Sequence, residues 1–129
     1  NAGAWYADYV YTAATAGIVH GYGDNTFRPD SPIARAEALA MVLRTAGIPS
    51  TTYSHSFFYD VRDPWQKPYV ETAYRLNLIN GYLDGTFRPS NSLSRAEAAK
   101  IIANVMNLEM TQAPELKPLD TENAPRWLK

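Results

Sequence analysis

Gly81-Tyr82-Leu83-Asp84-Gly85-Thr86-Phe87-Arg88-Pro89 decides the fold, because the chain contains nearly the same stretch at Gly21-Tyr22-Gly23-Asp24-Asn25-Thr26-Phe27-Arg28-Pro29. Shifting the sequence by 60 residues aligns the two stretches. It also makes roughly 16 of 43 positions identical without a gap. This similarity predicts two copies of one structural unit, each with the stretch at its centre.

Each unit is predicted to be a helix, a loop and a second helix. The first helices start near Trp5 and Trp65, and the second helices start at Arg35 and Arg95. Apolar residues recur at steps of three and four, which predicts one buried face on each helix. The predicted buried positions are Trp5, Tyr9, Ala13 and Ala16; Trp65, Tyr69, Ala73 and Leu76; Leu39, Val42, Leu43 and Ala46; and Ala99, Ile102, Ala103 and Met106.

Residues with special backbone preferences mark where the helices begin and end. Gly17 and Asn77 are residue types that end helices in the left-handed conformation. Ser94 and Glu97 form a capping-box pattern, whereas Ala34 lacks the hydroxyl that this device needs. We therefore expect the second helix of the first unit to begin less sharply.

The central loop is predicted to be a rigid turn. Asn25 in one copy is replaced by Gly85 in the other, and these residue types most readily adopt positive φ. Asp24 and Asp84 can close the turn through their side chains. Arg28 and Arg88 are predicted to bind loop carbonyls or to stack on the neighbouring tyrosines.

The units divide the chain into three parts and give an all-α fold class. Residues 1–49 form repeat one, which is cut at its N-terminal side, and residues 50–109 form repeat two. Residues 110–129 are the start of a third repeat or a linker, since Asp120 and Pro125-Arg126-Trp127 resemble the segment around Trp65. The first residue is not Met, so we expect a piece of a longer polypeptide.

Composition and motifs argue against several functions. The net charge of −1 gives no support to nucleic-acid binding, and the absence of cysteine excludes thiolate metal sites. His20 is matched by Asn80 and His55 lies outside the repeated positions, so a shared catalytic histidine is excluded. No nucleophile elbow or phosphate loop is present, and the loop aspartates lack the spacing of a calcium loop. We expect no catalysis, no cofactor and no metal site.

These motifs resemble the S-layer homology family. The resemblance rests on Phe58-Tyr59-Asp60-Val61, on Gly81 to Pro89, on Leu93-Ser94-Arg95-Ala96-Glu97, and on their counterparts in repeat one. It implies a pseudo-threefold helical bundle whose inter-repeat grooves bind a secondary cell-wall polysaccharide, an acidic or pyruvylated polymer, or a peptidoglycan-linked one. It also implies that an exported protein is held at the cell surface. The polysaccharide-binding residues implied are Arg35, Arg95, Asp60, Trp65, Gly21, Gly81, Asp24 and Asp84.

The two arginines at helix starts carry the ligand hypothesis. There the helix dipole is positive and amide donors point outward, so Arg35 and Arg95 can form a site for a carboxylate. The alternative is that each arginine pairs with a glutamate or lies over an aromatic ring. Trp5 and Trp65 can stack on a sugar, but their helical spacing favours packing in the core.

Two departures from the family pattern affect these expectations. Ala34 replaces the usual threonine, and the third repeat is almost absent, so at most one complete inter-repeat groove can form. The alternative function is a structural protein-protein assembly module that packs through incomplete repeats, including self-association through the third repeat. Arginines buried against protein carboxylates would favour assembly, and arginines lining an open groove would favour carbohydrate.

Overall fold

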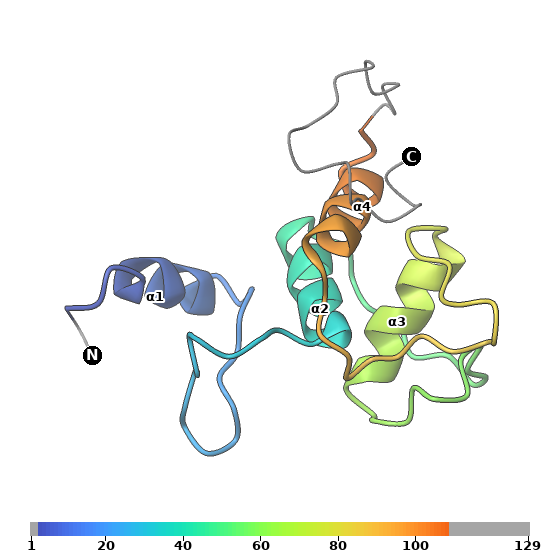
Figure 1. Cartoon of the computed structure of the whole chain (residues 1–129), viewed down its shortest axis with the longest axis horizontal. Helices are drawn as coiled ribbons and strands as arrows, with labels where there is room; N and C mark the ends of the chain where they lie inside the picture. Colours follow the sequence, from blue (N-terminus) through green and yellow to red (C-terminus); the bar gives the residue numbers. More distant parts are fainter. Residues whose placement is uncertain (1–2, 109–129) are drawn as a thin grey trace, which may run out of the picture.

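The computed structural model describes residues 3–108. This part of the chain contains four helices and no β-strand, which confirms the all-α prediction. They are α1 (Ala7–Thr15), α2 (Arg35–Thr45), α3 (Gln66–Arg75) and α4 (Arg95–Val105) (Figure 1). The expected start of a third repeat lies outside the described residues, and the pseudo-threefold packing stays a prediction.

The helix boundaries follow the sequence signals closely. The second helix of each repeat begins at Arg35 and Arg95, as predicted. Gly17 and Asn77 adopt φ of 72° and 58° just after the first helices, which confirms them as left-handed terminators. Within residues 3–108 no helix is long and apolar enough to cross a bilayer.

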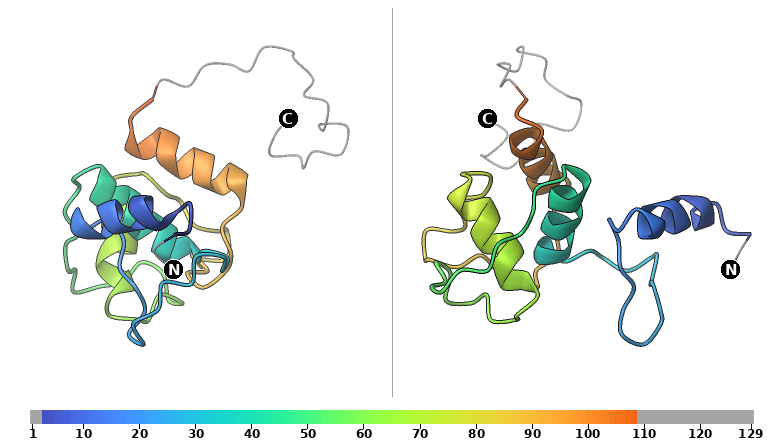
Figure 2. Two further views of the ribbon diagram at one scale, coloured as in Figure 1. Left: turned by 90° about the vertical axis from the view of Figure 1, so that its left-hand side faces the viewer. Right: turned by 180° about the vertical axis from the view of Figure 1, so that it is seen from behind.

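The core lies around α2, which packs against α3 and α4 (Figure 2). Leu39 and Leu43 of α2 are fully buried, as the stripe predicted, whereas Ala46 at the helix end is exposed. The largest fully buried side chains are those of Phe58, in the segment before α3, and Phe87, in the segment after it. Repeat two therefore closes over the second helix of repeat one.

The predicted core position of Trp5 is wrong. Trp5 and Tyr9 are 84% and 73% exposed, α1 contains no buried residue, and Figure 1 shows α1 set apart from the other helices. The corresponding helix α3 buries Val70 and Ala73 against α2, the second helix of the repeat before it. Within the described chain no such helix precedes α1, so the same apolar pattern has nothing to pack on.

The predicted stripe on α4 is wrong for the same reason. Ile102 and Met106 are 46% and 57% exposed, and Ala99 is exposed as well. The buried residue of α4 is Ile101, on the side that faces α2. On α2 the equivalent stripe is covered by α3, whereas the described chain has no following first helix to cover α4.

The second helix of repeat one begins as sharply as that of repeat two, contrary to expectation. The amides of Arg35 and Ala36 donate to the carbonyls of Asn91 and Pro89, at 2.9 and 3.0 Å. Repeat two therefore satisfies two other first-turn donors of α2, which fixes the start of the helix although Ala34 has no hydroxyl to accept from the Glu37 amide. Around α4, the predicted capping box of Ser94 and Glu97 is present.

Both central loops have the predicted turn. Asn25 and Gly85 adopt φ of 63° and 79°, and Asp24 and Asp84 each accept from the amide two residues later, at 3.0 Å. Loop two is fixed further by Asp60, whose carboxylate accepts from the amides of Phe87 and Arg88 at 2.9 and 2.7 Å.

We expect Asp60→Ala to lower the free energy of unfolding by about 2–3 kcal/mol, because it leaves two backbone donors without their charged acceptor. Urea denaturation measures the effect. Asp30→Ala, an exposed loop aspartate, is the control and should change the free energy by less than about 0.5 kcal/mol. Equal effects of the two substitutions would contradict this role for Asp60.

Candidate functional site

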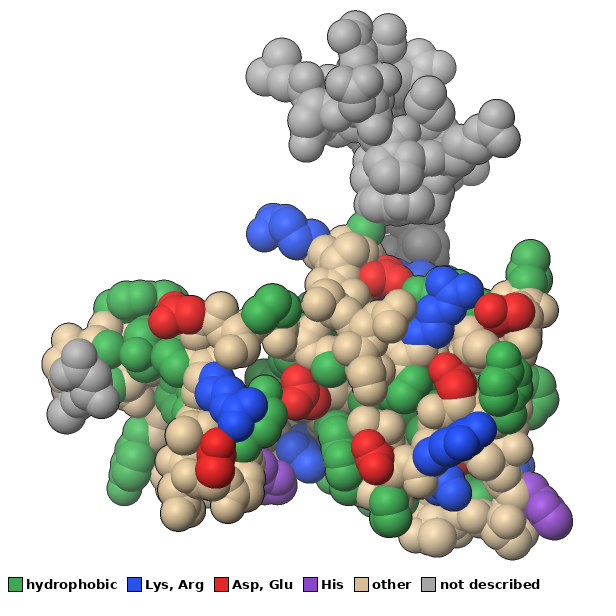
Figure 3. Space-filling view, turned by 60° about the horizontal axis from the view of Figure 1, so that its bottom comes forward, with side chains coloured by type: hydrophobic (Ala, Val, Ile, Leu, Met, Phe, Trp, Pro, Cys, Tyr) green, Lys and Arg blue, Asp and Glu red, His purple; other side chains and the backbone are tan. Residues whose placement is uncertain are grey.

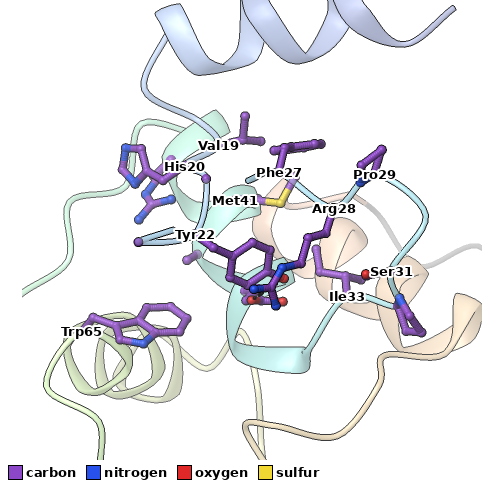
Figure 4. A pocket seen from close by; sticks show the side chains of 16 residues that line it. Val19, His20, Tyr22, Phe27, Arg28, Pro29, Ser31, Ile33, Met41 and Trp65 are labelled. Carbon is purple, nitrogen blue, oxygen red and sulfur yellow. Dashed lines mark hydrogen bonds between the residues drawn. The ribbon is translucent and has the colours of Figure 1, made fainter. Parts of the chain in front are cut away.

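A cavity of about 610 Å³, called here the large cavity, lies between the loop of repeat one, α2 and the start of α3 (Figure 4). The loop supplies one wall, α2 supplies the floor, and Trp65 closes the side next to α3. The residues that line it are Val19, His20, Gly21, Tyr22, Gly23, Phe27, Arg28, Pro29, Ser31, Pro32, Ile33, Glu37, Ala40, Met41, Arg44 and Trp65.

Three half-exposed aromatic rings border the cavity. Trp65, Tyr22 and Phe27 are 45%, 36% and 37% exposed, so each presents apolar ring surface to solvent. Gly21 allows the two sides of the loop to approach closely. A Cβ at this position would lie 2.8 Å from the carbonyl oxygen of Thr26, which is too short for a real contact. Half-exposed rings beside a tight backbone turn form a surface suited to flat, partly apolar ligands such as sugar rings.

Two arginines bring positive charge to this cavity. Arg44 donates to the Tyr69 hydroxyl at 3.0 Å and to the Ile18 carbonyl at 3.2 Å, which fixes its guanidinium at the wall. Arg28 lies 4.2 Å from the centre of the Tyr22 ring, which confirms the predicted stacking. Its Nη2 is 2.7 Å from Asp24, so much of its charge is already compensated.

One carboxylate, that of Glu37, faces the same cavity. It accepts from the Ala34 amide at 2.9 Å and from the Tyr22 hydroxyl at 3.3 Å. Charges of both signs are also interspersed over the outer face in Figure 3, in agreement with the net charge of −1. The cavity therefore combines aromatic, cationic and hydrogen-bonding groups.

Arg35 does not line the large cavity but lines a smaller hollow beside the loop of repeat two. It is 7% exposed, its Nη1 lies 2.6 Å from Glu97, and its Nε donates to the Phe87 carbonyl at 3.0 Å. The guanidinium also lies 5.1 Å from the centre of the Tyr82 ring and 4.9 Å from that of Phe87. Pairing with a glutamate and stacking on a ring, the alternative that the sequence left open, is the geometry observed for Arg35.

This ion pair holds Glu97 in its charged form. Burial raises the pKa of Glu97, but hydrogen bonds from Ser94 and Tyr82, together with the charge of Arg35, outweigh it and bring the pKa below its ordinary value. Glu97 thereby links three elements: the start of its own helix, the Tyr82 loop and α2.

The predicted aspartates all serve loop structure in this conformation. Hydrogen bonds from the Thr26 hydroxyl, Arg28 and the Thr26 amide lower the pKa of Asp24 to about 2. Asp84 makes the matching contacts in repeat two, with its pKa lowered chiefly by hydrogen bonds from Thr86. Asp60 fixes loop two through backbone amides.

The structure thus divides the predicted site residues into four groups. Gly21 and Trp65 meet at the large cavity, whereas Arg35 and Gly81 line the small hollow of about 150 Å³. The three aspartates stabilise loops. Arg95 is exposed at the start of α4, apart from both hollows.

Sequence reasoning missed Arg44 and His20, which line the large cavity. The repeat comparison directed attention to positions that are the same in both copies, and these two residues are replaced by Asn104 and Asn80. Asn104 also donates to the Leu78 carbonyl, as Arg44 does to Ile18, so the backbone contact is repeated while the charge is not. Arg44 and His20 could have been found from the sequence by also considering the positions at which the two copies differ.

The described residues contain no group of three or more His, Asp or Glu side chains that could hold a metal ion. The arrangement at the large cavity can bind a ligand through ring stacking, hydrogen bonds and arginine charge.

Comparison with known proteins gives a consistent result. The profile of the S-layer homology domain matches residues 1–39 and 57–99. The chain is 31% identical over 125 residues to cell surface glycoprotein 1 of Acetivibrio thermocellus, covering 88% of this chain and 5% of that protein. It is 35% identical over 103 residues to the cellulosome-anchoring protein of the same organism, covering 77% and 22%.

An enzyme is also among the relatives. The chain is 33% identical over 112 residues to an amylopullulanase of Thermoanaerobacterium thermosulfurigenes, covering 86% of this chain and 6% of the enzyme. The chain therefore spans only a small part of the curated relatives that it matches.

We expect Glu97→Gln to reduce the free energy of unfolding by about 1–3 kcal/mol at neutral pH, because it removes the charged partner of Arg35. The folded-state pKa of Glu97 is lowered, so its carboxylate stabilises the fold above the ordinary value of 4.5 and loses this contribution as the pH falls below it. The difference between the variant and the parent should therefore narrow in acid.

Urea denaturation at a series of pH values measures this narrowing. Glu37→Gln is the matched control, since Glu37 has no arginine partner within residues 3–108, and it should lower the free energy by less. A difference for Glu97→Gln that stays constant down to pH 3 would argue against the ion pair as its cause.

Proposed function

The chain belongs to the S-layer homology domain family and is a module of the bacterial cell surface; on this premise we propose that it anchors an exported protein by binding an acidic polysaccharide of the cell wall. The module itself is non-catalytic in this proposal. The catalytic function of the enzyme relative belongs to the large part of that protein that this chain does not cover.

The observation that carries the proposal is the cavity of about 610 Å³ with Trp65, Tyr22 and Phe27 around it. Polysaccharides present flat apolar ring faces and many hydroxyl groups, and half-exposed aromatic rings match the former. The cavity lies between repeat one and the start of α3 in repeat two, so one ligand would contact both units.

An acidic or pyruvylated sugar fits the charge of this cavity through Arg44. The guanidinium is already fixed by Tyr69 and Ile18, so little side-chain entropy would be lost on binding a carboxylate. Arg28 would add a second donor at the rim, where Asp24 holds it. His20 lines the same wall and offers a further hydrogen-bonding group.

The other residues implied by the family resemblance take different parts in the proposed site. Trp65 and Gly21 would contact the polymer. Arg35 and Gly81, with Asp60, Asp24 and Asp84, would hold the loops and repeats that shape the cavity. Arg95 is exposed at the start of α4 and lies outside both hollows.

A second candidate function is assembly with other repeats, including self-association. The observation that favours it is that α1 and α4 each expose an apolar face, with Tyr9 73% and Ile102 46% exposed. Exposed apolar faces of this kind mark interaction surfaces.

We expect Trp65→Ala and Arg44→Asn each to weaken binding to purified cell walls about 5- to 30-fold, the equivalent of roughly 1–2 kcal/mol. Arg44→Asn introduces the residue that repeat two carries at this position, so the bond to Ile18 can be retained while the charge is lost. Co-sedimentation of the chain with walls over a range of protein concentrations gives the affinities.

Tyr11→Ala and Arg75→Asn are the matched controls, because both residues are exposed and lie outside the cavity. Walls from which the secondary polymer has been extracted with acid should bind neither parent nor variants. Undiminished binding by both cavity variants, or by extracted walls, would contradict the proposal.

A further inference from the structure

Arg28 and Arg88 adopt the same unfavourable backbone conformation in the two central loops. Their φ angles are 55° and 59°, in the left-handed region that residues with a Cβ rarely adopt. The other non-glycine residues with positive φ in the described part of the chain are asparagines, which tolerate this region better. An arginine therefore stands twice where asparagine or glycine would be less strained, which indicates that its side chain supplies something that they lack.

The side chain of Arg28 is held at three points within its own loop. Its Nη2 lies 2.7 Å from the Asp24 carboxylate, and its Nε donates to the Thr26 hydroxyl at 3.1 Å. Its guanidinium lies over the Tyr22 ring, 4.2 Å from the ring centre, and Figure 4 shows the two side chains together at the cavity. The two hydrogen bonds therefore fix the guanidinium against one face of the ring.

The hydroxyl end of Tyr22 is restrained as well. It donates to Glu37 Oε1 at 3.3 Å, and Glu37 accepts from the Ala34 amide at the start of α2. The ring thus connects the loop to α2 while it is 36% exposed and lines the large cavity. One restraint acts on the face of the ring and the other on its hydroxyl, so together they define the orientation of the ring.

Repeat two contains the same arrangement in a different environment. Its four contacts are Arg88 Nε to the Thr86 hydroxyl (3.3 Å), Arg88 Nη2 to Asp84 (3.2 Å), the Arg88 guanidinium to the centre of the Tyr82 ring (3.8 Å), and the Tyr82 hydroxyl to Glu97 (3.0 Å). Loop two is packed, with Phe87 fully buried, whereas the residues of loop one are exposed. The arrangement is therefore a property of the loop and does not depend on what covers it.

We propose that Arg28 is a positioning residue of the polymer site: it fixes the Tyr22 ring in the orientation that faces the large cavity and so presents the ring to a sugar. This inference rests on the proposed wall-binding function. Arg28 acts mainly through Tyr22, because Asp24 already compensates much of its charge. A ring held in one orientation loses little conformational entropy when a ligand binds. Tyr82 does not line the large cavity, so Arg88 has no such role.

Wall binding by Arg28→Asn tests the proposal. The substitution removes the guanidinium but suits the backbone, because asparagine adopts positive φ at Asn25, Asn77 and Asn107 of this chain. We expect co-sedimentation with purified walls to show binding about 3- to 5-fold weaker than that of the parent. Arg88→Asn is the matched control, since it removes the same contacts in repeat two, and it should bind within about twofold of the parent.

A double-mutant cycle with Tyr22→Ala shows whether Arg28 acts through the ring. Without the ring the guanidinium has nothing to orient, so Arg28→Asn should then change wall binding by less than about twofold. An equal loss in both backgrounds would mean that Arg28 contacts the polymer directly, which overturns the positioning role. Parent-like binding by Arg28→Asn, or an equal loss for Arg88→Asn, overturns it too.

Nuclear magnetic resonance of the free chain separates this inference from the proposed function. The ring current of Tyr22 should shift the δ-methylene protons of Arg28 upfield, and Arg28→Asn should move the Tyr22 ring signals. If these shifts are present but the parent does not bind walls, the wall-binding proposal is wrong and the orientation of Tyr22 by Arg28 stands. If the shifts are absent, the inference is overturned even when the parent binds. Arg28→Gly, which also suits positive φ, replaces Arg28→Asn if circular dichroism shows that the latter is unfolded.

Discussion

The guanidinium of Arg35 is the group on which the described structure depends most. It is nearly buried, and it joins the start of α2 to the Glu97 carboxylate and the Phe87 carbonyl of the other repeat. Removing one member of such a pair leaves the other charge or carbonyl poorly solvated, so the contact strongly specifies how the repeats meet. The two backbone bonds from the first turn of α2 fix the same orientation.

From this contact follows the difference between two loops of almost the same sequence. In repeat two, both Arg35 and Asp60 form hydrogen bonds with the loop, and Phe87 is fully buried. In repeat one, the loop has no described partner of either kind, and Phe27 is 37% exposed. This exposed loop of repeat one forms one wall of the large cavity.

The two first-turn arginines, Arg35 and Arg95, have different neighbours although each begins the second helix of its repeat. An arginine in the first turn does seek an anion, as the helix dipole argument requires. For Arg35 that anion is Glu97, which lies 62 residues away along the chain. For Arg95 no described carboxylate takes the role, so the two counterparts differ in environment although their local sequences match. Of the predicted site residues, Gly21 and Trp65 meet at the cavity, and Arg44 and His20 could not be found by comparing the repeats.

The sequence by itself determined the repeat, the all-α class, the helix starts, the left-handed terminators and the turn closed by Asp24 and Asp84. These features depend on residues a few positions apart, so local preferences are enough to specify them. The tertiary structure alone decided which apolar faces are buried, that Arg35 is enclosed while Arg95 is exposed, and that Trp65 lies opposite the loop of repeat one. Amphipathic periodicity shows that a face needs a partner, but whether a partner is present depends on packing between distant segments, which no local pattern encodes.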